Sequence, residues 1–453
     1  MPDIVGSTEA DALAALDAAE LSTGDRTEVN DDTTANGSVV SQDPAPGTEL
    51  AKGSAVAYVV SLGPVVEPFG LGGDLDQPNV SAQLDEVATT ISDIRGLPLG
   101  STPYDDATKK EQKELLASRS AIIHDPSAVA GEEATLKRMG LLPEGANLGK
   151  MLEQLYGQEL PIAYLEQRGR TSVLDTLDKL SVPQRAMAAR EFGRAVVNQE
   201  FGIDRARVGD SSDGDGAIAG LALEQGDGTA TMLAWSAANV TAGNQSKVEG
   251  VIVPGKDSIL DSMPPILARE YSFPFLEGRA FVDKLRSGAD WSGVDSAWGN
   301  PPESTEQIMH PKKYPGDRPT TISIDGLAGA LGGGWSEGWQ QTMGELRIGV
   351  WLADGAPGTQ DGPRAPVKLP KAGAAGGWGG DRLVSLDGPD GAWVIVWQTK
   401  WDAADDVDPF ISAATAAMAD LAGAHVALAA DVSGGVSNPA LVIMTSAADT
   451  LAV

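Results

Sequence analysis

The sequence contains no cysteine, which excludes disulfide bonds, thiolate nucleophiles and cysteine-ligated metals in all 453 residues. Only three histidines are present, His124, His310 and His425, and they are too scattered in the chain to form a local metal motif. No apolar run approaches the roughly 18 residues of a membrane-spanning helix, so we expect no transmembrane segment. The sequence begins without the pattern of a signal peptide.

Basic residues are scarce, with 33 Lys and Arg against 64 Asp and Glu and a formal net charge of −31. A surface this acidic repels the phosphates of nucleic acids and the headgroups of anionic lipids, so we expect no nucleic-acid partner. The same charge favours solubility and suits an extracellular setting. The length predicts two or three domains.

The first predicted domain is residues 1–64. Its predicted elements are a strand and turn at residues 2–6, a helix at residues 8–20, and β-branched strands at residues 39–42 and 55–61. The run Ser41-Gln42-Asp43-Pro44-Ala45-Pro46-Gly47-Thr48 lies between the two β-branched strands. This run and the order of elements resemble the PASTA domain, a fold of one helix and three strands.

The PASTA resemblance implies a place in the cell envelope, because such domains occur on the outer parts of penicillin-binding proteins and serine/threonine kinases. The favoured interpretation of this module is a solvated extracellular spacer without a ligand. The alternative follows from the association of such domains with peptidoglycan or β-lactam recognition, and makes peptidoglycan, or another envelope or extracellular protein, the candidate partner. An extracellular location also leads us to expect that an export signal has been removed from this sequence.

The remaining sequence predicts an α+β fold with a mainly helical core at residues 80–325, after a Gly- and Pro-rich linker at residues 65–79. A C-terminal α+β lobe is expected at residues 326–453. The helices predicted in the core are residues 80–95, 108–123, 132–139, 148–156, 182–201, 215–240 and 273–285. The elements predicted in the lobe are strands at residues 346–352, 392–399, 424–428 and 440–444 and a helix at residues 408–421.

The predicted helix at residues 182–201 contains Arg190-Glu191-Phe192-Gly193-Arg194. In zincins, His-Glu-x-x-His places two zinc ligands on one helical face, and the Glu acts as general base. The wider pattern Ala-Ala-x-Glu-x-x-x-Ala-x-x-x-Gln-x-Phe is similar to the metal-binding helix of a family of bacterial zincin-like metallopeptidases. Glu191 is kept in this chain, whereas arginine occupies both histidine positions.

Further blocks resemble the same family in the same order, between about residues 80 and 410. Ala222-Leu223-Glu224-Gln225-Gly226-Asp227-Gly228-Thr229 is similar to a family block whose Glu is the expected third ligand and aligns with Gln225. The most specific block is Pro-Pro-x-Ser-Thr-Glu-Gln-Ile-x-His-Pro, which here includes Ser304, Thr305, Glu306, Gln307 and His310. A later match is Gly377-Trp378-Gly379-Gly380-Asp381-Arg382.

The resemblance therefore implies a metallopeptidase scaffold without its metal ligands, because a guanidinium group has no lone pair to offer a metal. We expect no cofactor and no metal at Arg190, Arg194 and Gln225, and we expect Glu191 to remain without a catalytic role. Two buried arginines need acidic partners, and the nearest candidates are Glu191, Glu224 and Asp227.

The favoured hypothesis is a non-catalytic, exported or cell-envelope protein that uses this scaffold and the PASTA module for binding or architecture. The alternative is a peptidase-like hydrolase with an unrecognised active site. The sequence leaves the oligomeric state open.

Three local patterns each allow two interpretations. The tryptophan-rich lobe either lines a sugar or peptide groove or anchors the lobe to its neighbour. Asp210, Asp213 and Asp215 form either an acidic surface loop or a calcium loop. His310 is either a structural or capping residue or a ligand.

Overall fold

The computed structural model places the chain in two compact units. One unit comprises residues 1–71 together with residues 101–103 and 165–170, and the other comprises the remaining residues. The structure describes residues 1–29, 34, 37–61, 78–158, 160–166, 168–203, 213–254, 257–288, 290–354, 373–419, 421, 425–429 and 437–446. Most of the predicted linker, residues 65–77, lies outside the described residues, and its last two residues already belong to a helix.

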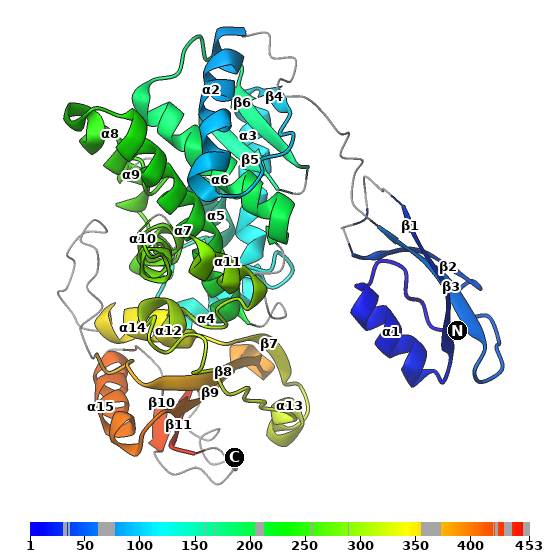
Figure 1. Cartoon of the computed structure of the whole chain (residues 1–453). Helices are drawn as coiled ribbons and strands as arrows, with labels where there is room; N and C mark the ends of the chain where they lie inside the picture. Colours follow the sequence, from blue (N-terminus) through cyan, green and yellow to red (C-terminus); the bar gives the residue numbers. More distant parts are fainter. Residues whose placement is uncertain are drawn as a thin grey trace. The chain divides into compact units, whose positions relative to one another are not determined.

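The smaller unit is one helix and a three-stranded sheet. Its elements are α1 (Glu9–Ala18), β1 (Ser22–Val29), β2 (Val39–Asp43) and β3 (Ala55–Ser61) (Figure 1). The α1 helix begins after Thr8, whose side chain accepts a hydrogen bond from the amide of Asp11. Strand β3 is central, parallel to β1 and antiparallel to β2. Its buried side chains Val56, Tyr58 and Val60 form a small core with α1.

The prediction of one helix and three strands is confirmed, but one strand was misplaced. Residues 2–6 are described by the structure and form no strand, whereas β1 follows the helix. Strand β1 has the sequence Ser-Thr-Gly-Asp-Arg-Thr-Glu-Val and lies at an edge of the sheet. Because most of its described side chains are exposed, it lacks the alternation of apolar residues that predicts a strand.

The first half of the larger unit is helical with a small sheet. Its elements are α2 (Pro78–Arg95), β4 (Tyr104–Ala107), α3 (Lys109–Ala117), η1 (Ser118–Ile122), α4 (Val129–Arg138), α5 (Leu148–Tyr156), β5 (Ile162–Leu165) and β6 (Arg170–Leu174). The predicted helices of this region are confirmed. The sheet, in the order β4-β6-β5, was not predicted, because strands of four or five residues are too short for an apolar alternation to be recognised.

Three long helices form the centre of the larger unit: α6 (Val182–Phe201), α7 (Gly214–Asn239) and α10 (Pro265–Leu285) (Figure 1). Glycines allow these helices to approach closely. A Cβ atom at Gly193 would lie 2.9 Å from Thr231 of α7, one at Gly226 would lie 2.3 Å from the Gly278 carbonyl oxygen, and one at Gly278 would lie 2.2 Å from the carbonyl oxygen of Ala222. The α7 helix is therefore buried against both neighbours along most of its length.

Short helices connect the centre to the C-terminal sheet. They are η3 (Ala242–Asn244), α8 (Gln245–Glu249), α9 (Asp257–Leu260), α11 (Ser292–Gly299), α12 (Thr305–Met309) and α13 (Leu327–Leu331). The C-terminal elements are β7 (Ser336–Gln341), α14 (Gly344–Asp354), β8 (Trp378–Asp387), η4 (Pro389–Gly391), β9 (Trp393–Trp401), η5 (Ala404–Asp406), α15 (Val407–Met418), β10 (His425–Ala429) and β11 (Pro439–Thr445). The antiparallel sheet has the order β10-β11-β9-β8-β7.

Most of the predicted lobe elements are confirmed, but residues 346–352 were wrongly predicted as a strand. They belong to α14, which packs against α10, β8 and α15. A helix enclosed on several sides carries apolar residues around most of its surface, and Leu346, Ile348 and Val350 then also alternate as in a strand. Trp351, Trp378, Trp397 and Trp401 are at most 1% exposed, so these tryptophans form core and cannot line a groove.

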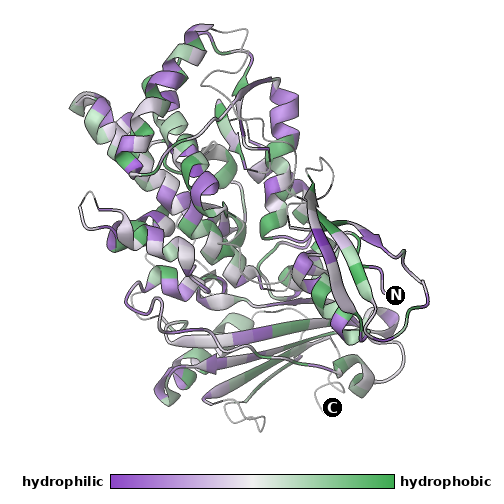
Figure 2. Ribbon diagram, turned by 45° about the vertical axis from the view of Figure 1, so that its right-hand side comes forward, coloured by the Kyte–Doolittle hydropathy of each residue, from purple (hydrophilic) through white to green (hydrophobic). Residues whose placement is uncertain are grey.

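The polarity of the helices agrees with this architecture. In Figure 2 the helices of the larger unit carry both hydrophilic and hydrophobic residues, as amphipathic helices do. Among the described residues, no helix combines the length and apolarity that crossing a bilayer requires.

Candidate functional site

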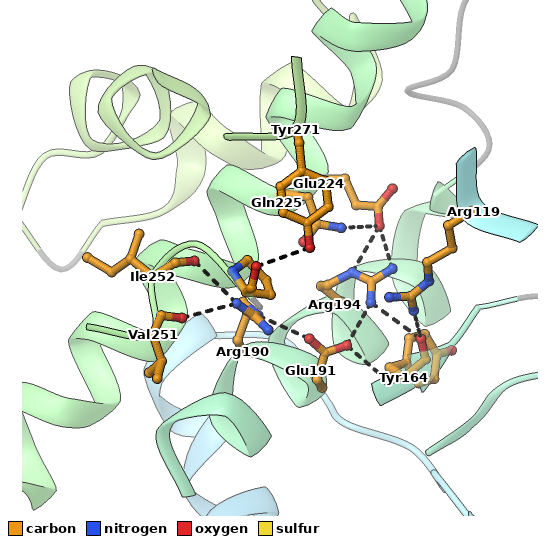
Figure 3. Close-up of polar contacts among 11 residues, drawn as sticks. Arg119, Tyr164, Arg190, Glu191, Arg194, Glu224, Gln225, Val251, Ile252 and Tyr271 are labelled. Atoms are coloured by element: carbon orange, nitrogen blue, oxygen red, sulfur yellow. Dashed lines mark hydrogen bonds and ion pairs between the residues drawn. The ribbon is translucent and has the colours of Figure 1, made fainter. Parts of the chain in front are cut away.

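The residues of the zincin-like pattern lie on two adjacent helices in the interior of the larger unit. Arg190, Glu191 and Arg194 are on α6, and Glu224 and Gln225 are on α7 (Figure 3). The first four are at most 2% exposed and Gln225 is 8% exposed. The sequence positions expected to hold a metal are therefore brought together, in the interior of the larger unit.

These five side chains form one hydrogen-bonded cluster, here called the Arg190–Glu224 cluster. Arg194 donates from Nε (2.9 Å) and Nη2 (2.5 Å) to Oε1 of Glu224, and from Nη1 (2.7 Å) to Oε2 of Glu191. Arg190 donates from Nε to the other oxygen of Glu191 at 3.0 Å. The Gln225 amide donates to Oε1 of Glu224 at 3.1 Å. Both arginines thus have acidic partners, as a buried charge requires.

Main-chain groups complete the cluster (Figure 3). The amide of Tyr164 on β5 donates to Glu191 Oε2 at 2.9 Å, and its carbonyl oxygen accepts hydrogen bonds from Arg194 and Arg119. Arg190 Nη1 also donates to the carbonyl oxygen of Ile252 at 3.3 Å. Arg119 and Tyr164 could not be predicted from the sequence, because no local pattern marks residues that reach the cluster from distant elements.

The Glu191 carboxylate is held in its ionised form. Burial alone would raise its pKa, but the positive charges of Arg194, Arg190 and Arg119 and the amide of Tyr164 outweigh burial and lower the pKa to about 2. A carboxylate with so low a pKa is a weak base, and its oxygens are already occupied by protein donors.

Asp227 does not lie with the arginines of α6, contrary to the expectation from sequence. It pairs instead with Arg95 at the end of α2, with Nε to Oδ1 and Nη2 to Oδ2 distances of 3.0 Å each. Trp298 of α11 donates from its indole nitrogen to the same carboxylate at 2.9 Å. Asp227 is three residues beyond Glu224 and faces α2 and α11, whereas Glu224 faces α6.

The residues of the Arg190–Glu224 cluster do not fit zinc. Arg190 and Arg194 present only N–H donors, and the amide nitrogen of Gln225 is directed at Glu224. Gly228 also fits the arginines closely, because a Cβ atom there would lie 2.9 Å from Cγ of Arg194. The interior at this position is filled by the guanidinium side chains and their partners.

The Ser-Thr-Glu-Gln block forms the short helix α12. Ser304 caps it by accepting a hydrogen bond from the amide of Gln307 at 3.2 Å. The Thr305 hydroxyl donates to Asp215 of α7 at 2.5 Å and accepts from the amide of Leu346 of α14 at 3.2 Å. The block therefore connects the central helices to the C-terminal elements.

His310 is the C-cap residue of α12, and its Nε2 lies 3.0 Å from Oε1 of Glu345. Its position agrees with the structural interpretation. Glu306 of the same helix is 2% exposed and accepts a hydrogen bond from Lys313 at 2.6 Å. Burial raises the pKa of Glu306 to about 8, and the charges of Glu345 and Asp402 act in the same direction against that of Lys313.

The Trp378–Arg382 block contains a further buried acid. Asp381 accepts hydrogen bonds from the amides of Met343 and Gly344 and from the indole nitrogens of Trp378 and Trp397, each at 2.9 Å. Four donors on one carboxylate fasten the start of α14 to β8 and β9.

A further buried charge cluster was not predicted. His124 Nδ1 lies 3.0 Å from Glu132 of α4, and its Nε2 lies 3.5 Å from Glu270 of α10. Arg347 of α14 donates to Glu270 at 2.6 Å. Burial alone would lower the pKa of His124, but Glu132 and Glu270 raise it above its ordinary value.

Of the three acidic residues at the start of α7, Asp210 lies outside the described residues. Asp213 and Asp215 each have a structural role. Asp213 caps α7 by accepting from the amide of Gly216 at 3.0 Å. Asp215 is buried and bound to Thr305. These contacts do not form a calcium loop at Asp213 and Asp215.

Comparison with known proteins adds two family assignments. The PASTA domain family matches residues 1–61, and a domain of unknown function (DUF8575) matches residues 336–448. A search of curated proteins returns no match. Among solved structures, the chain is similar to the entire extracellular region of the Ser/Thr kinase PrkC from Staphylococcus aureus, at 17% identity and a TM-score of 0.15. That similarity covers 24% of this chain and 35% of the kinase region.

The chain is thus a multidomain protein with a PASTA module at its N-terminal end. Its C-terminal sheet, with α14 and α15, corresponds to the DUF8575 region.

Proposed function

We propose that this chain is a non-catalytic binding protein of the cell envelope. In this proposal the PASTA domain binds peptidoglycan, and the larger unit is a zincin-like scaffold that has lost its metal ligands. The observation that carries the non-catalytic assignment is the Arg190–Glu224 cluster, in which guanidinium groups and an amide stand at the three expected ligand positions.

The chemistry of Glu191 supports the same proposal. A general base has to reach a proton of substrate or water, and its pKa has to lie near the working pH. Glu191 is 2% exposed and has a pKa of about 2, so it meets neither condition. Its carboxylate instead joins Arg190 and Arg194 to the backbone of Tyr164.

The PASTA domain supports the location and the partner. Within this domain, Tyr58 cannot act as an aromatic platform for a sugar ring, since it is 5% exposed and its hydroxyl donates to Glu9 at 3.0 Å. Binding to peptidoglycan would therefore depend on the exposed polar side chains of the sheet and helix. Arg26, which is 41% exposed and pairs with Glu9, is one such group.

Co-sedimentation of the full chain with purified peptidoglycan tests the binding, with chitin as the control polysaccharide. We expect the chain to sediment with peptidoglycan and to remain soluble with chitin. Recovery of the chain in the supernatant of both samples would contradict the assigned partner.

Elemental analysis tests the absence of catalysis, and we expect no stoichiometric zinc in the purified chain. About one zinc per chain, together with peptide hydrolysis that Glu191→Gln abolishes, would contradict the proposal that the chain is non-catalytic. The scaffold itself is tested by the triple variant Arg190→His, Arg194→His and Gln225→Glu. We expect this variant to bind zinc and the single variant Gln225→Glu to bind none; a folded triple variant without zinc affinity would rule out the zincin-like geometry.

A further inference from the structure

Two buried acids from different elements meet at Gly344, the first residue of α14. Asp381 of β8 accepts a hydrogen bond from the Gly344 amide at 2.9 Å. On the same residue, an added Cβ atom would lie 1.7 Å from Oδ1 of Asp215, which belongs to the first turn of α7. The two carboxyl groups therefore lie against one glycine, in an interior where water screens neither of them.

The surroundings of the two acids contain little positive charge to balance them. Among the residues that the structure describes, no basic side chain donates a hydrogen bond to Asp215 or Asp381. Asp213, the N-cap residue of α7, adds a further negative charge that acts on Asp215. Arg347 of α14 attracts Asp215 but is bound to Glu270 of α10 at 2.6 Å. Two further acids, on α12 and α14, have partners of their own: Glu306 pairs with Lys313, and Glu345 pairs with His310.

The hydrogen-bond donors indicate which of the two acids keeps a proton. Two buried carboxyl groups this close cannot both be ionised without a large cost, so one of them stays protonated. The four groups bound to Asp381 are backbone amides and indole nitrogens, two on each oxygen, and such groups only donate. Asp381 is therefore the ionised member. Oδ1 of Asp215 instead lies 2.5 Å from the hydroxyl of Thr305, and a hydroxyl accepts as readily as it donates.

The pKa values agree with this assignment. Burial raises the pKa of Asp215 well above its ordinary value, and Asp213 and Asp381 act in the same direction against the hydrogen bonds from Thr305. Burial also raises the pKa of Asp381, but its four donors oppose the rise. The proton shared by the pair thus belongs on Asp215.

Asp215 stands where three elements join. Its Oδ2 accepts from the amide of Thr305 on α12 at 3.0 Å, and the Thr305 hydroxyl accepts from the amide of Leu346 on α14 at 3.2 Å. We propose that the protonated carboxyl group of Asp215 is a pH-sensitive switch that holds α12 and the start of α14 to α7. Loss of the proton places two negative charges against Gly344, and their repulsion opens the start of α14.

Hydrogen exchange of the Leu346 amide, measured by NMR on the full chain, tests the switch. The quantity compared is the protection factor, because exchange of an unprotected amide itself becomes faster as the pH rises. An acid with a raised pKa favours the closed state at low pH, and this advantage is lost as the pH rises from its ordinary value of 3.8 through the raised one. We expect the wild-type protection factor to fall at least about tenfold between about pH 4.5 and 6.5. Over this range Glu191 stays ionised and His124 stays protonated, so neither contributes.

Asp215→Asn is the decisive variant, because its neutral amide replaces the protonated carboxyl group and does not titrate. We expect its protection factor at Leu346 to stay constant over the same pH range. An equally steep fall in Asp215→Asn and in the wild type would overturn the proposal, as would a constant protection factor in the wild type.

A second variant tests the connection to α14 without altering either acid. Thr305→Val removes the hydroxyl that accepts from Leu346, so we expect low protection of that amide at every pH, whereas Thr305→Ser should retain the wild-type behaviour. Wild-type protection in Thr305→Val would overturn the proposal. The matched control is Glu144→Gln, which removes an exposed carboxylate elsewhere. It should retain the wild-type fall, and its loss in this control would overturn the proposal, because the effect would then reflect the general acidity of the surface.

Discussion

Arg194 of α6 and Glu224 of α7 share two hydrogen bonds to a single carboxylate oxygen, from Nε at 2.9 Å and from Nη2 at 2.5 Å. Both side chains are 1% exposed. This pair joins the two helices at the position where the zincin resemblance places a metal. The interaction that holds α6 to α7 here is thus an ion pair inside the protein.

Replacement of Arg194 with alanine should therefore be strongly destabilising. It would leave Glu191 and Glu224 buried with fewer positive partners, and breaking a buried pair in this way costs about 3–5 kcal/mol. Denaturant unfolding gives the change in free energy. Lys110→Ala is the control, because Lys110 is 86% exposed in its pair with Glu114 and should change stability by at most about 1 kcal/mol. Equal midpoints for the two variants would show that the cluster contributes no more than a surface pair.

Glu191 should give the protein a distinct sensitivity to acid. Its pKa falls from an ordinary value of 4.5 to about 2 on folding, so its contribution to stability is present above about pH 4.5 and is lost as the pH falls toward 2. Unfolding free energies measured across this range should decrease with decreasing pH. In Glu191→Gln the same range should show a shallower slope, because the titrating group is gone. Identical slopes in the two proteins would be incompatible with the lowered pKa.

His124 should have the opposite effect on the alkaline side. Its folded pKa is raised above 6.5, so its stabilising contribution is fully present below about pH 6.5 and is lost as the pH rises through the folded value. We expect the unfolding free energy of the wild type to decrease as the pH rises above about 6.5. The variant His124→Gln should be less stable at about pH 6 and should depend less on pH above it. A wild-type stability that stays constant as the pH rises above about 6.5 would argue against a protonated His124.

The contact between α7 and α10 predicts a strict requirement for glycine at position 278. A methyl group there would lie 2.2 Å from the carbonyl oxygen of Ala222, so Gly278→Ala has to push the helices apart. Overpacking of this kind is destabilising by about 1–3 kcal/mol or more. Gly299→Ala is the matched control, since its added methyl group meets nothing within 4 Å. Thermal unfolding should show a large decrease for the first variant and little change for the second.

The sequence predicted the long helices well because their apolar residues recur at the spacing of a helical face. The α2 and α5 helices show this directly, with buried residues at steps of three and four. The prediction failed at α14, whose apolar residues also alternate as in a strand, and at β1, most of whose described side chains are exposed.

The candidate site was predicted in part for a similar reason. Arg190, Glu191 and Arg194 share one helical face, so spacing alone brings them together. Tyr164, Arg119 and Ile252 reach the same place from other elements, and no local pattern reveals such contacts. Asp227 was assigned to the wrong partner because the direction in which a fully buried helix turns each side chain depends on all of its neighbours.

The two hydrogen bonds of the Thr305 hydroxyl bear on how this protein could be divided or recombined. Thr305 precedes the DUF8575 region, yet it contacts both Asp215 of α7 and Leu346 inside that region. A segment that begins at residue 336 would lose both hydrogen bonds of Thr305 and leave the amide of Leu346 without this acceptor. The segment that folds as one unit is therefore longer than the segment that sequence similarity delimits. A chimera should include α12 and its contact residue on α7.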